Sequence, residues 1–129
     1  MTVLLDTRCW LWWIAEPDRL SVSPLDPIRD PTNRILIPSA TSREIAIKYS
    51  IGKLVRPEPP GRFVRSRLER DRLEPLPVLH SHTLRTALLP YHHRDPFDRL
   101  LIAHALVEGI PILTDDPAFG AYELQTLQP

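Results

Sequence analysis

Residues 92–116, HHRDPFDRLLIAHALVEGIPILTDD, constrain the fold of this chain most, because they predict a buried helix followed at once by a buried strand. Asp95 and Pro96 are typical of a helix start, since an Asp side chain accepts from free N–H groups and proline loses nothing at the first helical position. The helix should run to about Val107 and stop at Gly109. Because it is apolar on nearly every side, other elements must cover it. Residues 110–113 then have the length and apolar character of a strand.

Strand and helix patterns alternate along the rest of the chain. Short apolar runs predict strands over residues 3–5, 34–37 and 76–79, and helices are expected over residues 8–15, from 39 or 41 to 51, 61–73 and 83–89. This alternation indicates a parallel sheet with helices on both faces. The Pro-rich stretch 57–60 looks like a linker, but the acids on its two sides are expected to act together. We therefore predict one α/β domain over residues 1–129, with a short, mostly parallel central sheet.

The charge balance and the cysteine count exclude several classes of protein. The chain has 16 basic and 16 acidic side chains, so its formal net charge is zero. A protein that binds nucleic acids in general is strongly basic, so the charge balance argues against that class. No apolar run approaches the roughly 20 residues that span a bilayer, and the first residues lack a basic leader pattern, so we expect a cytoplasmic protein without membrane contact. A single cysteine, Cys9, excludes an internal disulfide. The histidines have no zinc-site spacing and are interpreted as structural or solvated: His80, His82, His92, His93 and His104.

Four acidic residues are expected to meet at one edge of the sheet. Asp6 follows the first strand and Asp116 the last clear one, while Glu44 and Asp98 occupy the first turns of two helices. Ligands of such sheets bind outside the carboxyl ends of the strands. Carboxylates that converge there repel one another, and a hard divalent cation such as Mg²⁺ or Mn²⁺ offsets that cost. These ions commonly act on phosphate esters by activating water and stabilising the leaving oxygen.

Each of these acids also has a structural interpretation. Asp98 stands three residues after Asp95, and Glu44 three residues after Thr41, which is the position of a capping-box acid. Glu44 also stands four residues before Lys48, at the spacing of a helical ion pair. The other two acids that could serve as caps are Asp6 and Asp116. The joint placement of all four favours a metal site, while two further acids are interpreted as mainly structural: Asp95 and Asp115.

The four acids lie in motifs that resemble those of a known family. In chain order the motifs are Leu4-Leu5-Asp6-Thr7, Arg43-Glu44-Ile45-Ala46, RDPFDRLLIA at residues 94–103, and Leu113-Thr114-Asp115-Asp116. They resemble the acidic motifs of PIN-domain proteins, in particular the VapC-like toxin branch of bacterial toxin–antitoxin pairs. The resemblance covers nearly the whole chain, and the segment around Asp98 is its most specific part.

The resemblance implies a PIN fold and an endoribonuclease that depends on Mg²⁺ or Mn²⁺, with RNA as substrate and an antitoxin that blocks the site. Carried over residue by residue, Asp6 and Asp98 would be the principal metal ligands, and Glu44 and Asp116 would complete the catalytic cluster. The family's last motif, Thr-x-Asp, selects Asp116 over Asp115. The alternative is a PIN-fold module that binds RNA or protein without cleaving it.

Contacts with phosphate and with partner proteins are expected from side chains near the acids and on helix surfaces. The phosphate-contact candidates are Arg8, Arg43 and Arg99. By the resemblance, the two threonines beside the acids would hydrogen-bond a metal-bound water at the substrate site: Thr7 and Thr114. The arginine-rich segment is interpreted as a solvated helix face, with an RNA or partner surface as the alternative; its members are Arg62, Arg65, Arg67, Arg70 and Arg72. Trp10 and Trp13 lie on one face of the expected helix and suit the core. Trp12 lies off that face, and because an exposed Trp often marks an interface, it predicts a contact in a homodimer or with the antitoxin.

Overall fold

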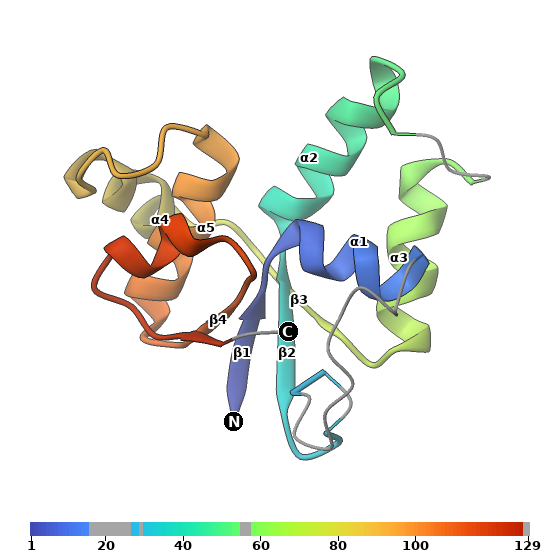
Figure 1. The fold of residues 1–129 in the computed structure, drawn as a ribbon. Coiled ribbons are helices and arrows are strands. Elements are labelled where there is room, and N and C mark those ends of the chain that lie inside the picture. The colour runs from blue at the N-terminus through green and yellow to red at the C-terminus, as the bar shows by residue number, and fades with distance from the viewer. Residues whose placement is uncertain (16–26, 29, 55–57, 128–129) are drawn as a thin grey trace.

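The computed structural model describes residues 1–15, 27–28, 30–54 and 58–127, and its centre is a five-stranded sheet (Figure 1). The strands are β1 (Thr2–Leu5), β2 (Arg34–Pro38), β3 (Glu74–Leu76), β4 (Ile112–Leu113) and β5 (Thr126–Leu127). Their order is β3-β2-β1-β4-β5, and each pair of neighbours runs parallel. The predicted parallel α/β sheet is therefore confirmed, with β1 at its middle.

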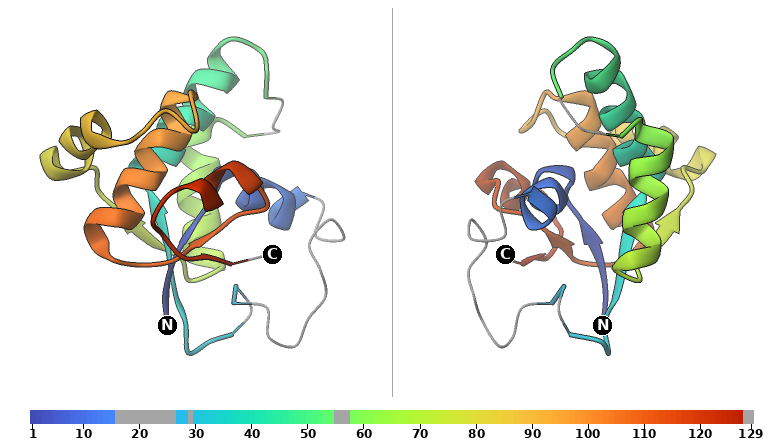
Figure 2. Two further views of the ribbon diagram at one scale, coloured as in Figure 1. Left: turned by 60° about the vertical axis from the view of Figure 1, so that its left-hand side comes forward. Right: turned by 90° about the vertical axis from the view of Figure 1, so that its right-hand side faces the viewer.

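Helices cover both faces of this sheet. The described helices are α1 (Thr7–Ala15), α2 (Ser39–Ser50), α3 (Pro60–Arg70), α4 (His80–Arg85) and α5 (Pro96–Glu108), with the 3₁₀ helices η2 (Thr86–Leu88) and η3 (Pro117–Ala121). Figures 1 and 2 show α4 and α5 on one side of the sheet, and α1 and α3 on the other. No helix in the described part of the chain is long and apolar enough to cross a membrane.

The central strand β1 is buried on both faces. Val3 and Leu5 pack with Trp10 in one hydrophobic cluster, whereas Leu4 packs with Ile102 of α5 in a second cluster on the opposite face. Alternate residues of a strand point to opposite faces, and a parallel sheet covered on both sides needs apolar residues at every position. The polar residue that follows β1 is therefore delivered from the most buried part of the domain to the carboxyl edge of the sheet.

Three elements near the sheet edges differ from the sequence prediction. The third strand covers Glu74–Leu76 instead of residues 76–79, because beyond Leu76 the Val78 N–H donates to the Ser39 hydroxyl and not to a neighbouring strand. The helix predicted over residues 83–89 begins at His80 and tightens into the 3₁₀ helix η2. Strand β5, which pairs with β4, was not predicted. Residue 57 of the expected linker lies outside the described residues.

A buried histidine pair joins α4 to α5. The rings of His82 and His104 are fully buried, and their centroids lie 3.9 Å apart. His82 has partners on both ring nitrogens, the Leu79 N–H at Nδ1 and the Glu108 carboxylate, 2.6 Å away, at Nε2. Neither ring nitrogen of His104 has a hydrogen-bond partner within the described structure. Burial, reinforced by His82, lowers the pKa of His104 to about 4.

This low pKa predicts acid destabilisation. The unfolded chain protonates His104 near its ordinary pKa of 6.5, whereas the folded chain does so near 4, so the unfolded state binds more protons between these values. The free energy of unfolding should therefore fall as the pH drops through this window, by roughly 3 kcal/mol from this residue. Urea unfolding at a series of pH values would measure this effect. As the pH falls, the free energy of unfolding should decrease less steeply in His104→Leu than in the wild type. The control His80→Leu, which changes an exposed histidine of α4, should behave like the wild type. Identical slopes in all three proteins would refute the assignment.

Candidate active site

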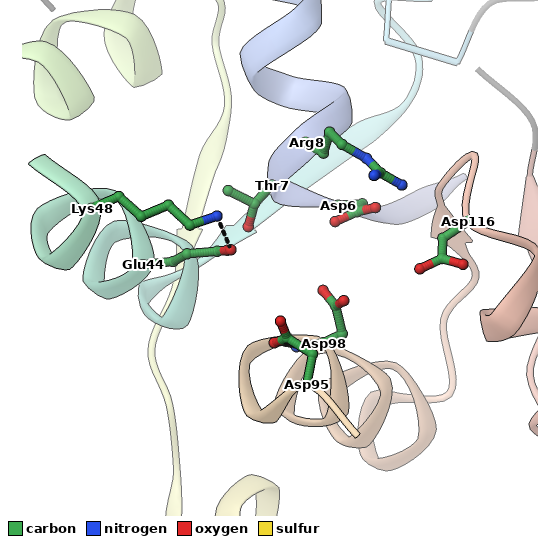
Figure 3. Close-up of a pocket in the computed structure, with 8 residues that line it drawn as sticks. All are labelled: Asp6, Thr7, Arg8, Glu44, Lys48, Asp95, Asp98 and Asp116. Atoms are coloured by element: carbon green, nitrogen blue, oxygen red, sulfur yellow. Dashed lines mark hydrogen bonds and ion pairs between the residues drawn. The ribbon is translucent and has the colours of Figure 1, made fainter. Parts of the chain in front are cut away.

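A pocket of about 170 Å³ opens at the carboxyl edge of the sheet. All four acids that the sequence singled out contribute to its wall (Figure 3). The lining residues are Asp6, Thr7, Arg8, Glu44, Lys48, Asp95, Asp98 and Asp116. They come from the end of β1 and the start of α1, from the middle and last turn of α2, and from the starts of α5 and η3, so Glu44 lies deeper in its helix than the first turn that the sequence predicted. The topology thus brings together residues that are far apart in the sequence.

Asp6 is the most deeply placed of these acids, with 4% of its surface exposed. The register pairs Leu5 with Leu113, which sets the residues after both strands side by side, and the Thr114 hydroxyl donates to the Asp6 carboxylate at 2.8 Å. Burial raises the pKa of Asp6 above its ordinary value, although the Thr114 hydrogen bond and the Arg8 charge oppose this. Thr114 was expected to hydrogen-bond a metal-bound water, but it is buried and its proton is already donated to Asp6. It therefore supports an acid of the pocket.

Asp98 points into the pocket from the first turn of α5 (Figure 3). The helix cap is Asp95, whose carboxylate accepts from the N–H groups of Phe97 and Asp98. The capping-box interpretation of Asp98 is wrong, because the Asp95 N–H that it would accept donates to His93 Nδ1 at 3.2 Å. Burial, followed by the charges of Asp6 and Asp95, raises the pKa of Asp98 to about 7.

Glu44 reaches the pocket from α2 and is 8% exposed. Its capping-box interpretation is also wrong, because α2 begins after Pro38 and no side chain caps it, so Thr41 is already inside the helix. The helical ion pair is present instead, with Lys48 Nζ 2.9 Å from Glu44 Oε1. Lys48 therefore brings a positive charge to the pocket through the ion pair that its spacing from Glu44 predicted.

Asp116, and not Asp115, lines the pocket. One Asp116 oxygen accepts from the Ala118 N–H at 2.9 Å and so caps η3, while the other lies 3.2 Å from His93 Nε2. Asp115 forms an ion pair with Arg8 at 3.2 Å. Asp116 thus combines the capping role and the pocket position that the sequence had offered as alternatives.

His93 is the pocket-side residue that sequence reasoning missed, since it was grouped with the structural or solvated histidines. Its Nε2 lies 2.9 Å from an oxygen of Asp98 and 3.2 Å from an oxygen of Asp116. These three residues offer ligand atoms that all lie within 4.8 Å of one another. The signal available in the sequence was its position two residues before the helix cap Asp95, where a side chain can fold back over the first turn.

Arg8 is the one predicted phosphate contact that is both exposed and part of the pocket wall among the described residues. Its guanidinium pairs with Asp115 and lies 5.3 Å from the centroid of the Trp12 ring. Trp12 is half-buried beneath this arginine, so it is less exposed than the sequence suggested. Arg8 can therefore present positive charge to a phosphate beside the acids.

Thr7 and Arg43 have weaker geometry for a phosphate contact. Thr7 lines the pocket, but it is buried and its hydroxyl donates to Thr41 at 3.0 Å. Arg43 is exposed with its guanidinium 5.5 Å from the centroid of the Phe97 ring, and it does not line the pocket.

Arg99 has a structural position, which corrects its assignment as a phosphate contact. It is buried, and its guanidinium nitrogens donate to four backbone carbonyls at 2.9 to 3.3 Å, those of Thr86, Leu89, Pro90 and His93. A guanidinium with its donors used in this way cannot turn toward a phosphate without leaving these carbonyls unpaired. Arg99 therefore shapes the loop that precedes α5.

The arginine-rich helix α3 lies apart from the pocket, since none of its residues lines it. Arg67 packs its guanidinium 5.4 Å from the Phe63 ring centroid, and Arg70 pairs with Asp71. The other arginines of this segment are exposed: Arg62, Arg65 and Arg72. A solvated face with local partners accounts for them.

Comparisons with known proteins give one family and one fold. A family model described as PIN domain matches residues 3–123. Ribonuclease VapC16 from Mycobacterium tuberculosis is 39% identical over 75 residues, which cover 52% of this chain and 53% of that protein, so the chain spans about half the length of this curated relative. A crystal structure of VapBC2 from Rickettsia felis bound to promoter DNA matches with a TM-score of 0.75 at 20% identity, covering 99% and 98% of the two chains. A toxin–antitoxin complex from Klebsiella pneumoniae matches with a TM-score of 0.61 at 14% identity, covering 97% and 95%.

Proposed function

Because this chain belongs to the PIN-domain family, we propose that it is an endoribonuclease that depends on a divalent cation and acts as the toxin of a toxin–antitoxin pair. The observation that carries the proposal is the convergence of Asp6, Glu44, Asp98 and Asp116 on one small pocket. The relative named as a ribonuclease supports the activity, and the similar fold of a toxin–antitoxin complex supports the biological role.

The chemistry of the donor set fits Mg²⁺ or Mn²⁺. The four acids offer only carboxylate oxygens, the ligands that hard cations prefer. The raised pKa values of Asp6 and Asp98 indicate that the folded chain holds these carboxylates at an electrostatic cost, which a divalent cation would offset. Asp6 and Asp98 would be the principal ligands, with Glu44 and Asp116 completing the set. When bound, the cation would supply a lowered pKa for the attacking water and charge stabilisation on the phosphate.

The remaining pocket residues would orient these acids and the substrate. Thr114 would hold Asp6 by the hydrogen bond already described, and Lys48 would hold Glu44. Arg8 would contact a phosphate of the RNA, because its side chain is 55% exposed beside the acids. Thr7 and Arg43 are weaker candidates for a contact with the substrate, because the Thr7 hydroxyl already donates to Thr41 and Arg43 does not line the pocket.

A cognate antitoxin and a second copy of the chain are the proposed partners. An antitoxin that covers the acidic pocket would exclude RNA from it. A homodimer is supported by Leu84 and Leu88, which stand one turn apart on the continuous α4 and η2 helix and are 69% and 76% exposed. The cytoplasm remains the predicted compartment, where RNA substrates are available.

The nature of the RNA ends tests this function. In-line attack of water on phosphorus leaves the RNA 2′-hydroxyl unreacted, so purified protein with Mg²⁺ or Mn²⁺ should give fragments with 5′-phosphate and 3′-hydroxyl ends. Excess EDTA should stop the cleavage. Mass spectrometry of the fragments, together with ligation and phosphatase sensitivity, would identify the ends.

Two other results would replace the proposal. Fragments ending in 2′,3′-cyclic phosphate, formed equally well in EDTA, would indicate a histidine-based nuclease that uses His92 or His93. Tight RNA binding without any cleavage, at every metal concentration, would indicate the non-catalytic PIN-fold module.

A further inference from the structure

His93 is held in place at both its backbone and its ring. Its N–H donates to the Tyr122 hydroxyl at 2.9 Å, and its carbonyl accepts from Arg99. Its ring meets the Phe119 ring edge-on, with centroids 5.7 Å apart and an interplanar angle of 74°. A histidine left to solvent would need none of these contacts, so the surrounding structure fixes where the imidazole points.

The loop that carries His93 is clamped by two residues from outside it. Arg99 of α5 donates to the carbonyls of Pro90 and His93, while the Tyr122 hydroxyl, which accepts from the His93 N–H, donates in turn to the Pro90 carbonyl at 2.8 Å. Both residues are buried. The clamp therefore ties the position of His93 to α5 and to the end of η3, the same two elements that present Asp98 and Asp116.

The hydrogen bonds assign the tautomer of the ring. Nδ1 accepts from the Asp95 N–H at 3.2 Å, so in the neutral imidazole the proton is on Nε2. The Nε2–H donates to an oxygen of Asp116 at 3.2 Å, and the same nitrogen lies 2.9 Å from an oxygen of Asp98. An Nε2 that carries a proton has no lone pair for a metal ion, so in this arrangement His93 serves the two carboxylates and is not itself a ligand.

We propose that His93 is a positioning residue that holds Asp98 and Asp116 at the separation needed to share one divalent cation. This inference rests on the proposed function. The two carboxylates come from different elements, the first turn of α5 and the cap of η3, and no other described side chain bridges them. Carboxylates that ligate metal ions are commonly fixed by such hydrogen bonds, and removing these partners typically weakens metal binding by about 10–100-fold.

Titration of Mn²⁺ into the protein without RNA, with free Mn²⁺ measured by electron paramagnetic resonance, tests the role directly. His93→Phe keeps a flat ring against Phe119 but has no N–H donor, and it should bind Mn²⁺ about 10–100-fold more weakly than the wild type. His93→Gln retains a donor near the position of Nε2 and should recover much of the affinity. His92→Phe is the matched control, because that neighbouring ring is exposed and packs on Tyr122 away from the acids.

Three results would overturn the inference. Wild-type affinity in His93→Phe would show that the donor is not needed, and a failure of His93→Gln to exceed His93→Phe would show that ring shape alone matters. Nitrogen modulation in the pulsed resonance spectrum of bound Mn²⁺, lost in His93→Gln, would make the imidazole a direct ligand. Thermal melts in EDTA should show that both variants are folded. If instead the wild type binds no Mn²⁺, or Asp98→Asn binds it equally well, the proposed function itself fails.

Discussion

Asp98→Asn should lower RNA cleavage by more than the roughly 10–100-fold typical of a lost supporting contact, yet leave the metal-free protein as stable as the wild type or more stable. The pKa of Asp98 is raised to about 7 in the folded chain, so the folded state binds more protons than the unfolded state between about 4 and 7. The contribution of this carboxyl to the free energy of unfolding is therefore fully present at low pH and is lost as the pH rises through 7. The Asn variant cannot ionise and escapes that loss, so it should gain on the order of 3 kcal/mol at pH 8 and little at pH 4.

Thermal melts at both pH values, with and without Mg²⁺, together with a cleavage assay, would check this prediction. Stabilisation by added Mg²⁺ should shrink in the variant, because a ligand stabilises the native state only in proportion to how tightly it binds. Asp71→Asn, which changes an acid at the end of α3 outside the pocket, is the control and should keep normal cleavage and a normal response to Mg²⁺. A destabilised Asp98→Asn that remains fully active would mean that this carboxylate only supports its helix.

Arg99→Ala should destabilise the protein by roughly 3–5 kcal/mol, because it leaves four carbonyls that accept from one buried guanidinium without their donor. Arg99→Lys should recover little, since an ammonium group is a compact point charge and cannot reproduce the planar fork of donors. Urea unfolding in EDTA would measure both changes, with the exposed Arg94→Ala as the control. A loss under 1 kcal/mol would show that the loop before α5 does not depend on this arginine.

The sequence predicted the elements whose signals are local and strong. The apolar run of β1, the Asp95 cap and the Gly109 stop of α5 lie where they were expected, because burial and capping act within a few residues. The convergence of Asp6, Asp98 and Asp116 also followed, since the carboxyl ends of parallel strands meet at one edge. Their role as metal ligands remains a prediction.

Other features depend on hydrogen bonds between segments that are distant in the sequence, and the hydrophobic periodicity of the sequence does not predict such bonds. The end of β3 is decided by the Ser39 hydroxyl from the start of α2, so a pattern read along the strand misplaces it. Arg99 was misassigned, and the contacts of His93 were missed, for the same reason. The path of the loop before α5 is set by Tyr122 and by carbonyl groups, not by side-chain pattern, and both residues look like ordinary polar positions in the sequence.

The hydrogen bond from Thr114 to Asp6 also bears on when the pocket can exist during synthesis. It joins residues 108 positions apart, and the central strand β1 gains its β4 neighbour only through the same late segment. Loop closure over such separations is slow and is completed only after most other contacts are available. A growing chain on the ribosome therefore carries Asp6 long before it has the hydroxyl that orients it or the acid at position 116. Any product that terminates before that point lacks a complete acidic pocket, so a fragment from incomplete translation would lack the site of the proposed activity.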